Sequence, residues 1–298
     1  MQTESHRMTE PLLVAENLTK DYGSFRALSG LNLTIAAGEV VGLLGPNGSG
    51  KSTALRSLLG FLKPTIGRAT IAGFDCWTQG VEARKQVAYL PGELRLYDTM
   101  TGRRLVSFLG KLRGEVPGPE VDMLAKKLDI DIDRPLTHMS SGMKRKVALL
   151  TVLLPKVPLI ILDEPTNTLD PTMRDELLEQ LRSAKARGQA VLFSSHVLQE
   201  VEAVCDRVLI LRRGELVHIQ EMSELREGRA VSARILETPP TSGPGGEALP
   251  TDAISDGQLN LTYRGALPAL LDWLAKQSLD DLKIEPQGLT PIYRRFHG

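Results

Sequence analysis

The chain has 298 residues, enough for one large domain or for one domain with a smaller unit attached. Lysine and arginine together number 36, as do aspartate and glutamate, so the net charge is zero, and 42% of the residues are hydrophobic. This balance argues against an intrinsically disordered chain and against a protein that binds nucleic acid through bulk positive charge.

The N-terminal segment MQTESHRMTEPLL is polar and has no apolar core, so we expect a flexible N-terminus over residues 1–11 and no secretory signal. The apolar region KVALLTVLLPKVPLIILDEP is interrupted by Thr151, Pro155 and Lys156, whereas a membrane span needs about 20 predominantly apolar residues. Cys76 and Cys205 form no CxxC pair and suit a reducing compartment. We therefore expect a cytoplasmic chain that does not itself cross a bilayer.

The first elements are short strands joined by turns over residues 12–44. The last of them, Val40–Leu44, is largely apolar and leads into glycine and proline. This pattern is typical of a strand covered on both faces, as in a parallel sheet. Leucines at helical spacing then predict a helix over residues 53–62, and similar spacing predicts helices over 105–112 and 121–128.

The next region predicts alternating helices and strands. Ser140 or Ser141 can cap a helix that runs to Leu154 and stops at Pro155. Further helices are predicted over residues 172–186 and 197–204, and strands over 159–162, 190–193 and 207–211. This alternation indicates an α/β fold with a doubly wound parallel sheet.

The composition changes after Glu227. The segment TPPTSGPGGEALP, residues 238–250, is rich in proline and glycine and predicts a loop. A short amphipathic helix is predicted over residues 267–276. We expect a main domain over residues 12–227 and a small α+β accessory region over 228–298.

The strongest local motif is GPNGSGKS, which follows the Val40–Leu44 strand and precedes a predicted helix. It matches G-x-x-x-x-G-K-[ST], the phosphate-binding P-loop, and its strand–loop–helix context disfavours a chance glycine-rich turn. Glycines let backbone N–H groups turn toward phosphate, and the helix N-terminus adds partial positive charge. Lys51 would reach the β- and γ-phosphates, and the Ser52 hydroxyl would bind Mg²⁺. The residues expected to bind the nucleotide here are Gly45, Pro46, Asn47, Gly48, Ser49, Gly50, Lys51, Ser52 and Thr53.

A second motif, LIILDEPT, places two carboxylates after a buried strand. Asp163 ends that strand at the edge where open α/β sheets bind ligands, and there it can hold Mg²⁺ through water. Glu164 follows directly and would orient or deprotonate an attacking water. A solvated acidic turn is the alternative, which the upstream P-loop disfavours.

Taken in order, these motifs resemble the ATP-binding cassette of ABC transporters, over about residues 12–225. MSSGM at residues 139–143 is similar to the LSGGQ-type signature of that family, and NTLD at 167–170 is similar to its D-loop. His196, after AVLFSS, matches the switch histidine, and Tyr22 matches the aromatic residue that stacks on adenine.

The resemblance implies a P-loop NTPase core of the ABC type, with an antiparallel β subdomain and a helical subdomain inserted at about residues 92–154. It also implies a mechanism with two chains, in which each ATP lies between the P-loop of one subunit and the signature of the other. Ser140, Ser141 and Gly142 would contact the γ-phosphate in trans, and Asp170 would couple the two sites.

Within each site, the resemblance makes Lys51, Glu164 and His196 the catalytic residues, with His196 donating to the γ-phosphate and holding Glu164 in register. Two alternatives stay open. Ser140 can also be a helix cap, and Tyr22 can be a packing residue.

The chain departs from the family pattern at two motifs. Where a Q-loop glutamine is expected, the sequence reads Pro91-Gly92-Glu93, and Glu93 is one position out of register. Met143 stands where the signature usually has glutamine. We interpret the Lys-Arg-Lys run at 144–146 and the arginine pair at 212–213 as solvated surface, and the five histidines show no metal-ligand spacing.

As a function, the resemblance implies an ATPase subunit that powers a separate membrane permease on the cytoplasmic face, with ATP and Mg²⁺ as cofactors. Its expected partners are the permease and a second ATP-binding subunit, either another copy or a close homologue, and no nucleic acid. YLPGELRLYDTMTGR and the C-terminal tail are similar to the exporter branch.

Two other functions are compatible with a P-loop. One is a non-transport ABC ATPase that acts as a switch on ribosomes or DNA. A single cassette, and the lack of a sustained heptad run between Lys51 and Ser140, disfavour it. The other is a small-molecule P-loop kinase, which would leave MSSGM and His196 unexplained.

Overall fold

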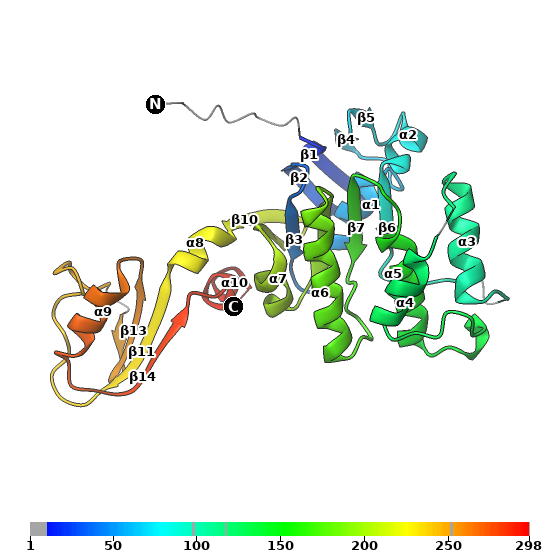
Figure 1. Ribbon diagram of the computed structural model, residues 1–298. Helices are drawn as coiled ribbons and strands as arrows, with labels where there is room; N and C mark the ends of the chain where they lie inside the picture. Colours follow the sequence, from blue (N-terminus) through cyan, green and yellow to red (C-terminus); the bar gives the residue numbers. More distant parts are fainter. Residues whose placement is uncertain (1–10, 97–98, 117, 251–252, 298) are drawn as a thin grey trace, which may run out of the picture. The chain divides into compact units, whose positions relative to one another are not determined.

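The computed structural model describes residues 11–96, 99–116, 118–250 and 253–297. The segment expected to be flexible, residues 1–11, lies outside these ranges except for Pro11. The chain divides into two compact units, Met1–Ile219 and Gln220–Gly298, and each is described by itself (Figure 1). The predicted boundary, after Glu227, lies eight residues beyond the boundary between these two units, after Ile219.

The first unit is built on one large sheet with the strand order β5-β4-β1-β2-β10-β9-β3-β8-β7-β6. Its strands are β1 (Leu13–Tyr22), β2 (Phe25–Ile35), β3 (Val40–Leu44), β4 (Ile66–Ile71), β5 (Phe74–Asp75), β6 (Val87–Leu90), β7 (Leu159–Asp163), β8 (Ala190–Ser195), β9 (Arg207–Arg212) and β10 (Glu215–Glu221).

The sheet has a parallel half and an antiparallel half. β3 pairs in parallel with β8 and β9, and β7 pairs in parallel with β6 and β8. Every residue of β3, β7 and β8 is buried, as expected for strands covered on both faces. β1 pairs antiparallel with β2 and β4. This confirms the predicted α/β fold with its antiparallel β subdomain.

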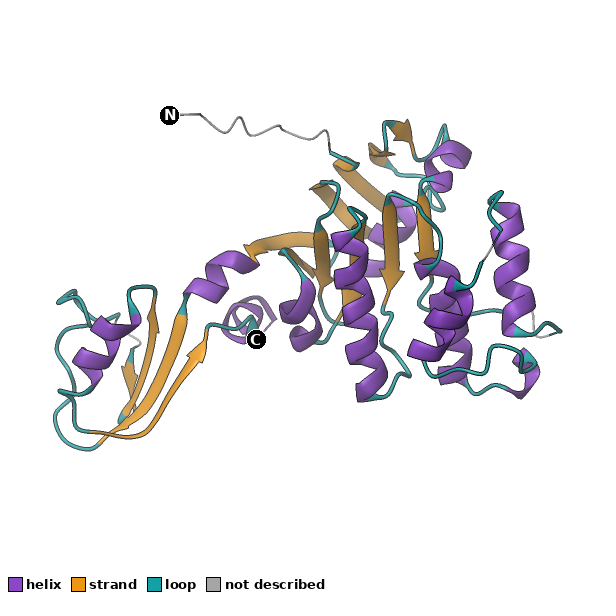
Figure 2. Cartoon of the chain, viewed as in Figure 1, coloured by secondary structure: helices purple, strands orange, loops and turns teal. Residues whose placement is uncertain are grey.

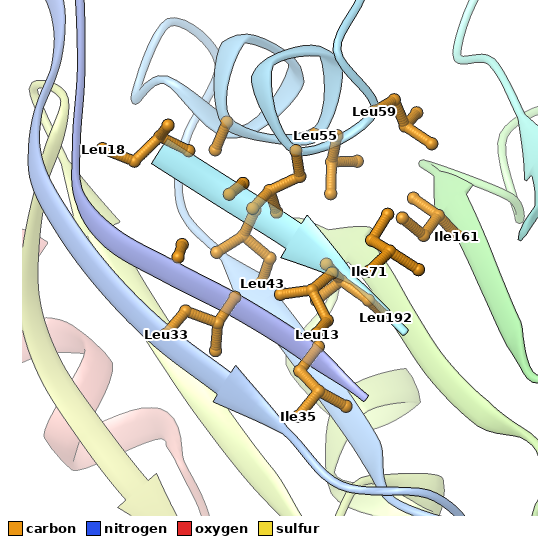
Figure 3. Packing of buried hydrophobic residues seen from close by; sticks show 14 of the residues in the cluster. Leu13, Leu18, Leu33, Ile35, Leu43, Leu55, Leu59, Ile71, Ile161 and Leu192 are labelled. Carbon is orange, nitrogen blue, oxygen red and sulfur yellow. The ribbon is translucent and has the colours of Figure 1, made fainter. Parts of the chain in front are cut away.

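Helices cover both faces of the parallel half. α1 (Lys51–Leu58) packs against β1, β2, β4 and β7. Leu43 of β3 and Leu55 of α1 share one apolar cluster (Figure 3). The preceding residue of β3, Gly42, faces the opposite way, because a Cβ built there would lie 2.8 Å from Val201 in α7 (Leu198–Val204). α6 (Pro171–Ala186) packs against α7 and β8.

α1 ends four residues before the predicted end at Leu62. Gly60 follows the helix with a φ of 69°, a left-handed conformation that commonly ends helices. A Cβ built at Gly60 would lie 1.8 Å from the carbonyl oxygen of Cys76, so a side chain has no space there. The close approach of a distant segment therefore fixes the end of this helix.

The helices between β5 and β7 are α2 (Gly80–Lys85), α3 (Gly102–Leu112), α4 (Glu120–Lys127), the short 3₁₀ helix η1 (Leu136–His138) and α5 (Ser141–Leu153). α5 packs against β6, α3 and α4. A small apolar cluster of Leu105, Leu136, Met139 and Val147 lies among them, and the partly buried Met143 packs against it. Methionine therefore contributes apolar packing at a position where glutamine would carry a polar amide.

Within the described ranges, no helix has both the length and the apolar character needed to cross a bilayer. Cys76 and Cys205 are both buried.

The second unit has its own sheet and core. Its elements are α8 (Met222–Glu227), β11 (Arg229–Ile235), β12 (Ile254–Ser255), β13 (Gln258–Tyr263), α9 (Leu267–Leu274), β14 (Leu279–Pro286) and α10 (Thr290–His297). The strands form an antiparallel sheet in the order β12-β13-β11-β14 (Figure 2). Trp273 of α9 packs among Val231, Leu259 and Leu270, and its indole N–H donates to the carbonyl oxygen of Ser242 at 2.9 Å. This bond ties the proline- and glycine-rich segment to the core.

Candidate active site

The loop over residues 45–50 joins β3 to α1 and requires glycine at several positions. Gly48 and Gly50 have φ values of 79° and 105°, which residues with side chains rarely adopt. A Cβ at Gly45 would lie 2.4 Å from Ser49 Oγ and 2.6 Å from the carbonyl oxygen of Leu211. Gly50 is the N-cap of α1, so the free N–H groups of the first turn begin where this loop ends.

Lys51 is the first residue of α1, and only 5% of its surface is exposed. Its Nζ donates to the carbonyl oxygens of Gly45 at 2.7 Å and Pro46 at 3.2 Å. The same nitrogen lies 3.4 Å from Glu164 Oε1. The ammonium group therefore lies between the loop and the carboxylate that follows β7.

Asp163 and Glu164 are linked through a serine of the neighbouring strand. Asp163, the last residue of β7, is 2% exposed, and its Oδ1 accepts a hydrogen bond from Ser194 Oγ at 2.7 Å. Ser194 Oγ in turn accepts from the backbone N–H of Glu164 at 2.9 Å. Because Asp163 and Ser194 are register partners in the parallel sheet, strand pairing itself sets this geometry.

The Glu164 side chain is a meeting point for three different segments. Its Oε2 accepts a hydrogen bond from Asn167 Nδ2 at 2.7 Å and lies 3.5 Å from His196 Nδ1. Its Oε1 faces Lys51. The structure thus brings together the three predicted catalytic residues, with Glu164 at the centre.

The surroundings of Glu164 favour its ionised form. Burial acts to raise the pKa of Glu164, but the hydrogen bond from Asn167 and the charges of Lys51 and His196 outweigh it. The pKa of this carboxyl therefore lies below its ordinary value. At neutral pH the group is a carboxylate that accepts protons and hydrogen bonds.

The predicted signature lies at the start of α5. Ser140 is the N-cap of the helix and accepts from the backbone N–H of Met143 at 3.3 Å. Ser140 and Ser141 are exposed. Among the residues that the structure describes, no hydrogen bond or ion pair connects residues 140–142 with the loop 45–53 of the same chain. The capping role left open for Ser140 is confirmed.

Two further predicted residues lie at element ends. Tyr22 ends β1, its ring is half exposed, and Lys20 Nζ lies 5.2 Å from the ring centroid. Asp170 is the N-cap of α6 and accepts from the backbone N–H of Met173 at 3.0 Å. The position of Asp170 thus has a structural role in addition to the one predicted for it.

Sequence reasoning missed several polar residues around this site. Asn167, Ser194 and Glu200 all bond to the segments that carry Glu164 and His196. Glu200, which is 5% exposed, accepts from the hydroxyls of Thr166 at 3.0 Å and Ser195 at 2.8 Å. The signal in the sequence that could have identified these residues was a polar side chain close to a motif.

One interpretation of the sequence was wrong. Arg145 belongs to the Lys-Arg-Lys run taken as solvated surface, but it is only 3% exposed. It lies on a buried face of α5, because helical spacing places position 145 on the same face as the buried Ala148 and Leu149.

The chain is similar to known proteins in both sequence and structure. The family model described as "ABC transporter" matches residues 28–167. The chain is 33% identical to the linearmycin resistance ATP-binding protein LnrL of Bacillus subtilis over 219 residues, which is 72% of this chain and 70% of that protein. It is 35% identical to a Nod factor export ATP-binding protein I of Rhizobium meliloti, over 71% of this chain and 65% of that protein. A solved structure of an ATP-binding subunit of an ABC transporter matches with a TM-score of 0.67 and 30% identity, over 72% of this chain and 92% of the other.

The chain belongs to the family of ABC transporter ATP-binding proteins. Its biochemical function is therefore that of the subunit that binds and hydrolyses ATP in an ABC transporter. Among the similar solved structures, one cassette is described as a dimer in a post-hydrolysis state bound to ADP and phosphate, and another as part of the ABC transporter complex cbiONQ. Neither a ribosome or DNA switch nor a small-molecule kinase is supported by these relatives.

Proposed function

We propose that two copies of this chain clasp ATP between the loop 45–53 of one copy and residues 140–142 of the other, and that hydrolysis powers export through a separate permease. The observation that carries this proposal is the convergence of Lys51 and His196 on the carboxylate of Glu164, each within 3.5 Å of it, with the three residues on three separate segments of the chain.

Binding of ATP uses groups that already face the same edge of the sheet. In this proposal the Lys51 ammonium binds the β- and γ-phosphates, and the N–H groups of the loop and of the first turn of α1 donate to phosphate oxygens. Tyr22 stacks on the adenine, which its half-exposed ring at the end of β1 permits.

Hydrolysis follows from the carboxylate at the centre of the cluster. Glu164 accepts a proton from the attacking water, whose oxygen bonds to the γ-phosphorus while the bond to the bridging oxygen breaks, giving ADP and phosphate. The lowered pKa of Glu164 keeps it ionised for this task at neutral pH. His196, half exposed beside it, donates to the γ-phosphate and holds Glu164 and the water in register.

Ser52 and Asp163 are the residues that would hold Mg²⁺. A hydroxyl and a buried carboxylate are hard oxygen donors of the kind this ion prefers, and Mg²⁺ usually takes only one or two protein ligands, with substrate phosphates and waters completing the set. When bound, the ion neutralises negative charge that develops on the phosphates.

The second copy supplies the other half of the site. Residues 140–142 lie at a helix N-terminus, a favourable place for a phosphate, and Ser140 and Ser141 are exposed and able to reach another chain. Asp170 then couples the two sites across the interface.

Export is proposed from the relatives, because similar proteins are named for linearmycin resistance and Nod factor export. The subunit would act at the cytoplasmic face of the membrane, held there by its permease. We propose no nucleic-acid partner, since the chain has no net positive charge.

Two substitutions test the catalytic assignment. Lys51→Ala is expected to abolish ATP hydrolysis and to weaken ATP binding, because it removes the charge that binds the phosphates. Glu164→Gln is expected to bind ATP normally and to hydrolyse it at least about 100-fold more slowly, because it removes the proton acceptor.

The measurements are phosphate release under saturating ATP and equilibrium binding of a fluorescent ATP analogue. The matched control is Glu82→Gln, which makes the same chemical change at an exposed position on α2. Near-normal turnover in either Lys51→Ala or Glu164→Gln would reject the assignment. Loss of ATP binding in Glu164→Gln would give that residue a structural role.

A further inference from the structure

Arg145 is a buried cation whose hydrogen bonds all go to backbone carbonyl oxygens. It lies on α5, five residues after the Ser140 cap. Nε donates to Pro165 O at 3.2 Å, and Nη1 donates to Pro91 O and Gly92 O, each at 3.0 Å. Nη2 donates to Asp163 O at 3.1 Å and to Glu164 O.

These bonds use the full donor capacity of the guanidinium group. Arginine has five N–H donors in a rigid planar fork, and here five carbonyl oxygens accept from them. Hydrogen bonds from a charged donor are shorter and stronger than neutral ones. The carbonyls belong to the loop after β6 and to the end of β7 with the loop that follows it, so this side chain fixes both segments against α5.

Glu164 is the residue most constrained by this arrangement. Its backbone N–H donates to Ser194, and its carbonyl oxygen accepts from Arg145. Its φ is 46°, an uncommon conformation for a residue with a side chain, and such conformations persist where the surroundings impose them. The peptide groups on both sides of Glu164 are thus held, and they set the direction of its carboxylate.

The loop after β6 reaches this region through its backbone. A Cβ built on Gly92 would lie 3.3 Å from Asp163 Oδ2, so a side chain at that position would meet the carboxylate directly. Glycine has none. The carbonyl oxygens of Pro91 and Gly92 instead bond to Arg145, which connects this loop to Glu164 through one guanidinium group.

Burying this cation has a cost. Burial lowers the pKa of Arg145, and the nearby charges of Asp163 and Glu164 only partly oppose that effect. A buried apolar residue at this position of α5 would avoid the desolvation of a guanidinium group.

We propose that Arg145 is a positioning residue, which holds the Glu164 backbone in its working conformation and transmits displacements of α5, the helix that begins at Ser140, to the catalytic carboxylate. This inference rests on the proposed role of Glu164 as proton acceptor. Arg145 itself touches neither ATP nor water in this scheme.

Arg145→Lys tests the proposal because it keeps the charge but has three donors, which cannot satisfy five carbonyl oxygens. We expect kcat to fall about 10-fold or more and the affinity for ATP to change less than about two-fold, since the loop 45–53 is untouched. Arg145→Gln, a neutral variant with two donors, is also expected to lower kcat with little change in the affinity for ATP. Thermal unfolding of each variant establishes which is folded at the assay temperature.

Two matched controls separate positioning from general destabilisation. Lys146 follows Arg145 on α5, and Lys146→Ala removes its hydrogen bond to the carbonyl oxygen of Asp129. Arg113→Lys disturbs a bond from an arginine to the Val87 carbonyl oxygen, away from Glu164. Both are expected to keep kcat within about two-fold of the parent.

The decisive readout is a double-mutant cycle of Arg145→Lys with Glu164→Gln. If Arg145 acts through Glu164, the double variant hydrolyses ATP no more slowly than Glu164→Gln alone, because residues that act as a unit are not additive. Multiplied losses would overturn the proposal, as would a loss of ATP affinity with unchanged kcat. Normal turnover of Glu164→Gln alone would instead reject the proposed function, so the two failures are distinguishable.

Discussion

At the scale of single residues, the chemistry of this protein depends on the contacts of one carboxylate. The motifs in the sequence predicted the types of residue at the site, because a P-loop and a carboxylate after a buried strand have strong local patterns. They could not predict that Asn167, Ser194 and Arg145 hold Glu164 in place. Those contacts depend on strand register and on helix rotation, which are set by the packing of distant segments.

Asn167→Ala tests the electrostatic account of this carboxylate. The amide donates to Glu164 Oε2 and lowers its pKa, so its removal should raise that pKa. A base with a higher pKa becomes protonated at higher pH, and the acid limb of the kcat profile should therefore move to higher pH.

The measurement is kcat against pH for Asn167→Ala and the parent, with the surface variant Asn32→Ala as control. An acid limb that stays in place or moves to lower pH would contradict the account.

At the scale of elements, strongly patterned segments could be predicted and weakly patterned ones could not. The predicted strand Val40–Leu44 is β3, with the same bounds, and the helix capped near Ser140 is α5. The strand β10 was missed, because ELVHIQE mixes polar and apolar residues, although in the sheet it lies between β2 and β9, the strand that directly precedes it in the sequence. The end of α1 depends on the backbone at Cys76, which no local pattern shows.

Ser140→Asp separates the two roles of the residue at the start of α5. Aspartate is a good N-cap and its charge suits a helix N-terminus, so thermal stability should be unchanged or higher. The same charge would repel a γ-phosphate from a second copy, so ATP-dependent dimerisation should be lost.

Ser140→Ala is the companion variant, expected to cost about 1 kcal/mol of stability through loss of the cap. Thermal unfolding and sedimentation with ATP measure the two effects. Normal dimerisation of Ser140→Asp would exclude a phosphate contact at this position.

At the scale of the whole molecule, the chain carries two units with separate cores. Composition alone indicated a main domain and an accessory region, because the pattern of alternating strands and helices ends and a segment rich in proline and glycine follows. The boundary itself, between Ile219 and Gln220, could not be read from composition, since β10 and α8 have no strong pattern of their own.

Differential scanning calorimetry should resolve two transitions that respond to different changes. Trp273→Ala should lower the midpoint temperature of one transition, because it removes a large side chain from the core of the second unit. The expected loss is about 3–5 kcal/mol of the unfolding free energy of that unit. Saturating ATP should raise the midpoint temperature of the other transition only. ATP at 100 times its dissociation constant stabilises the unit that binds it by about 2.7 kcal/mol. A shift of both transitions by either change would argue against separate cores.

We propose that two copies of this chain enclose ATP between the Lys51 loop of one copy and residues 140–142 of the other. The most direct test is the molar mass of Glu164→Gln in solution, measured by light scattering with and without ATP and Mg²⁺. We expect a monomer without nucleotide, and with ATP and Mg²⁺ a dimer that retains two ATP molecules. A protein that stays monomeric under saturating ATP would contradict this proposal.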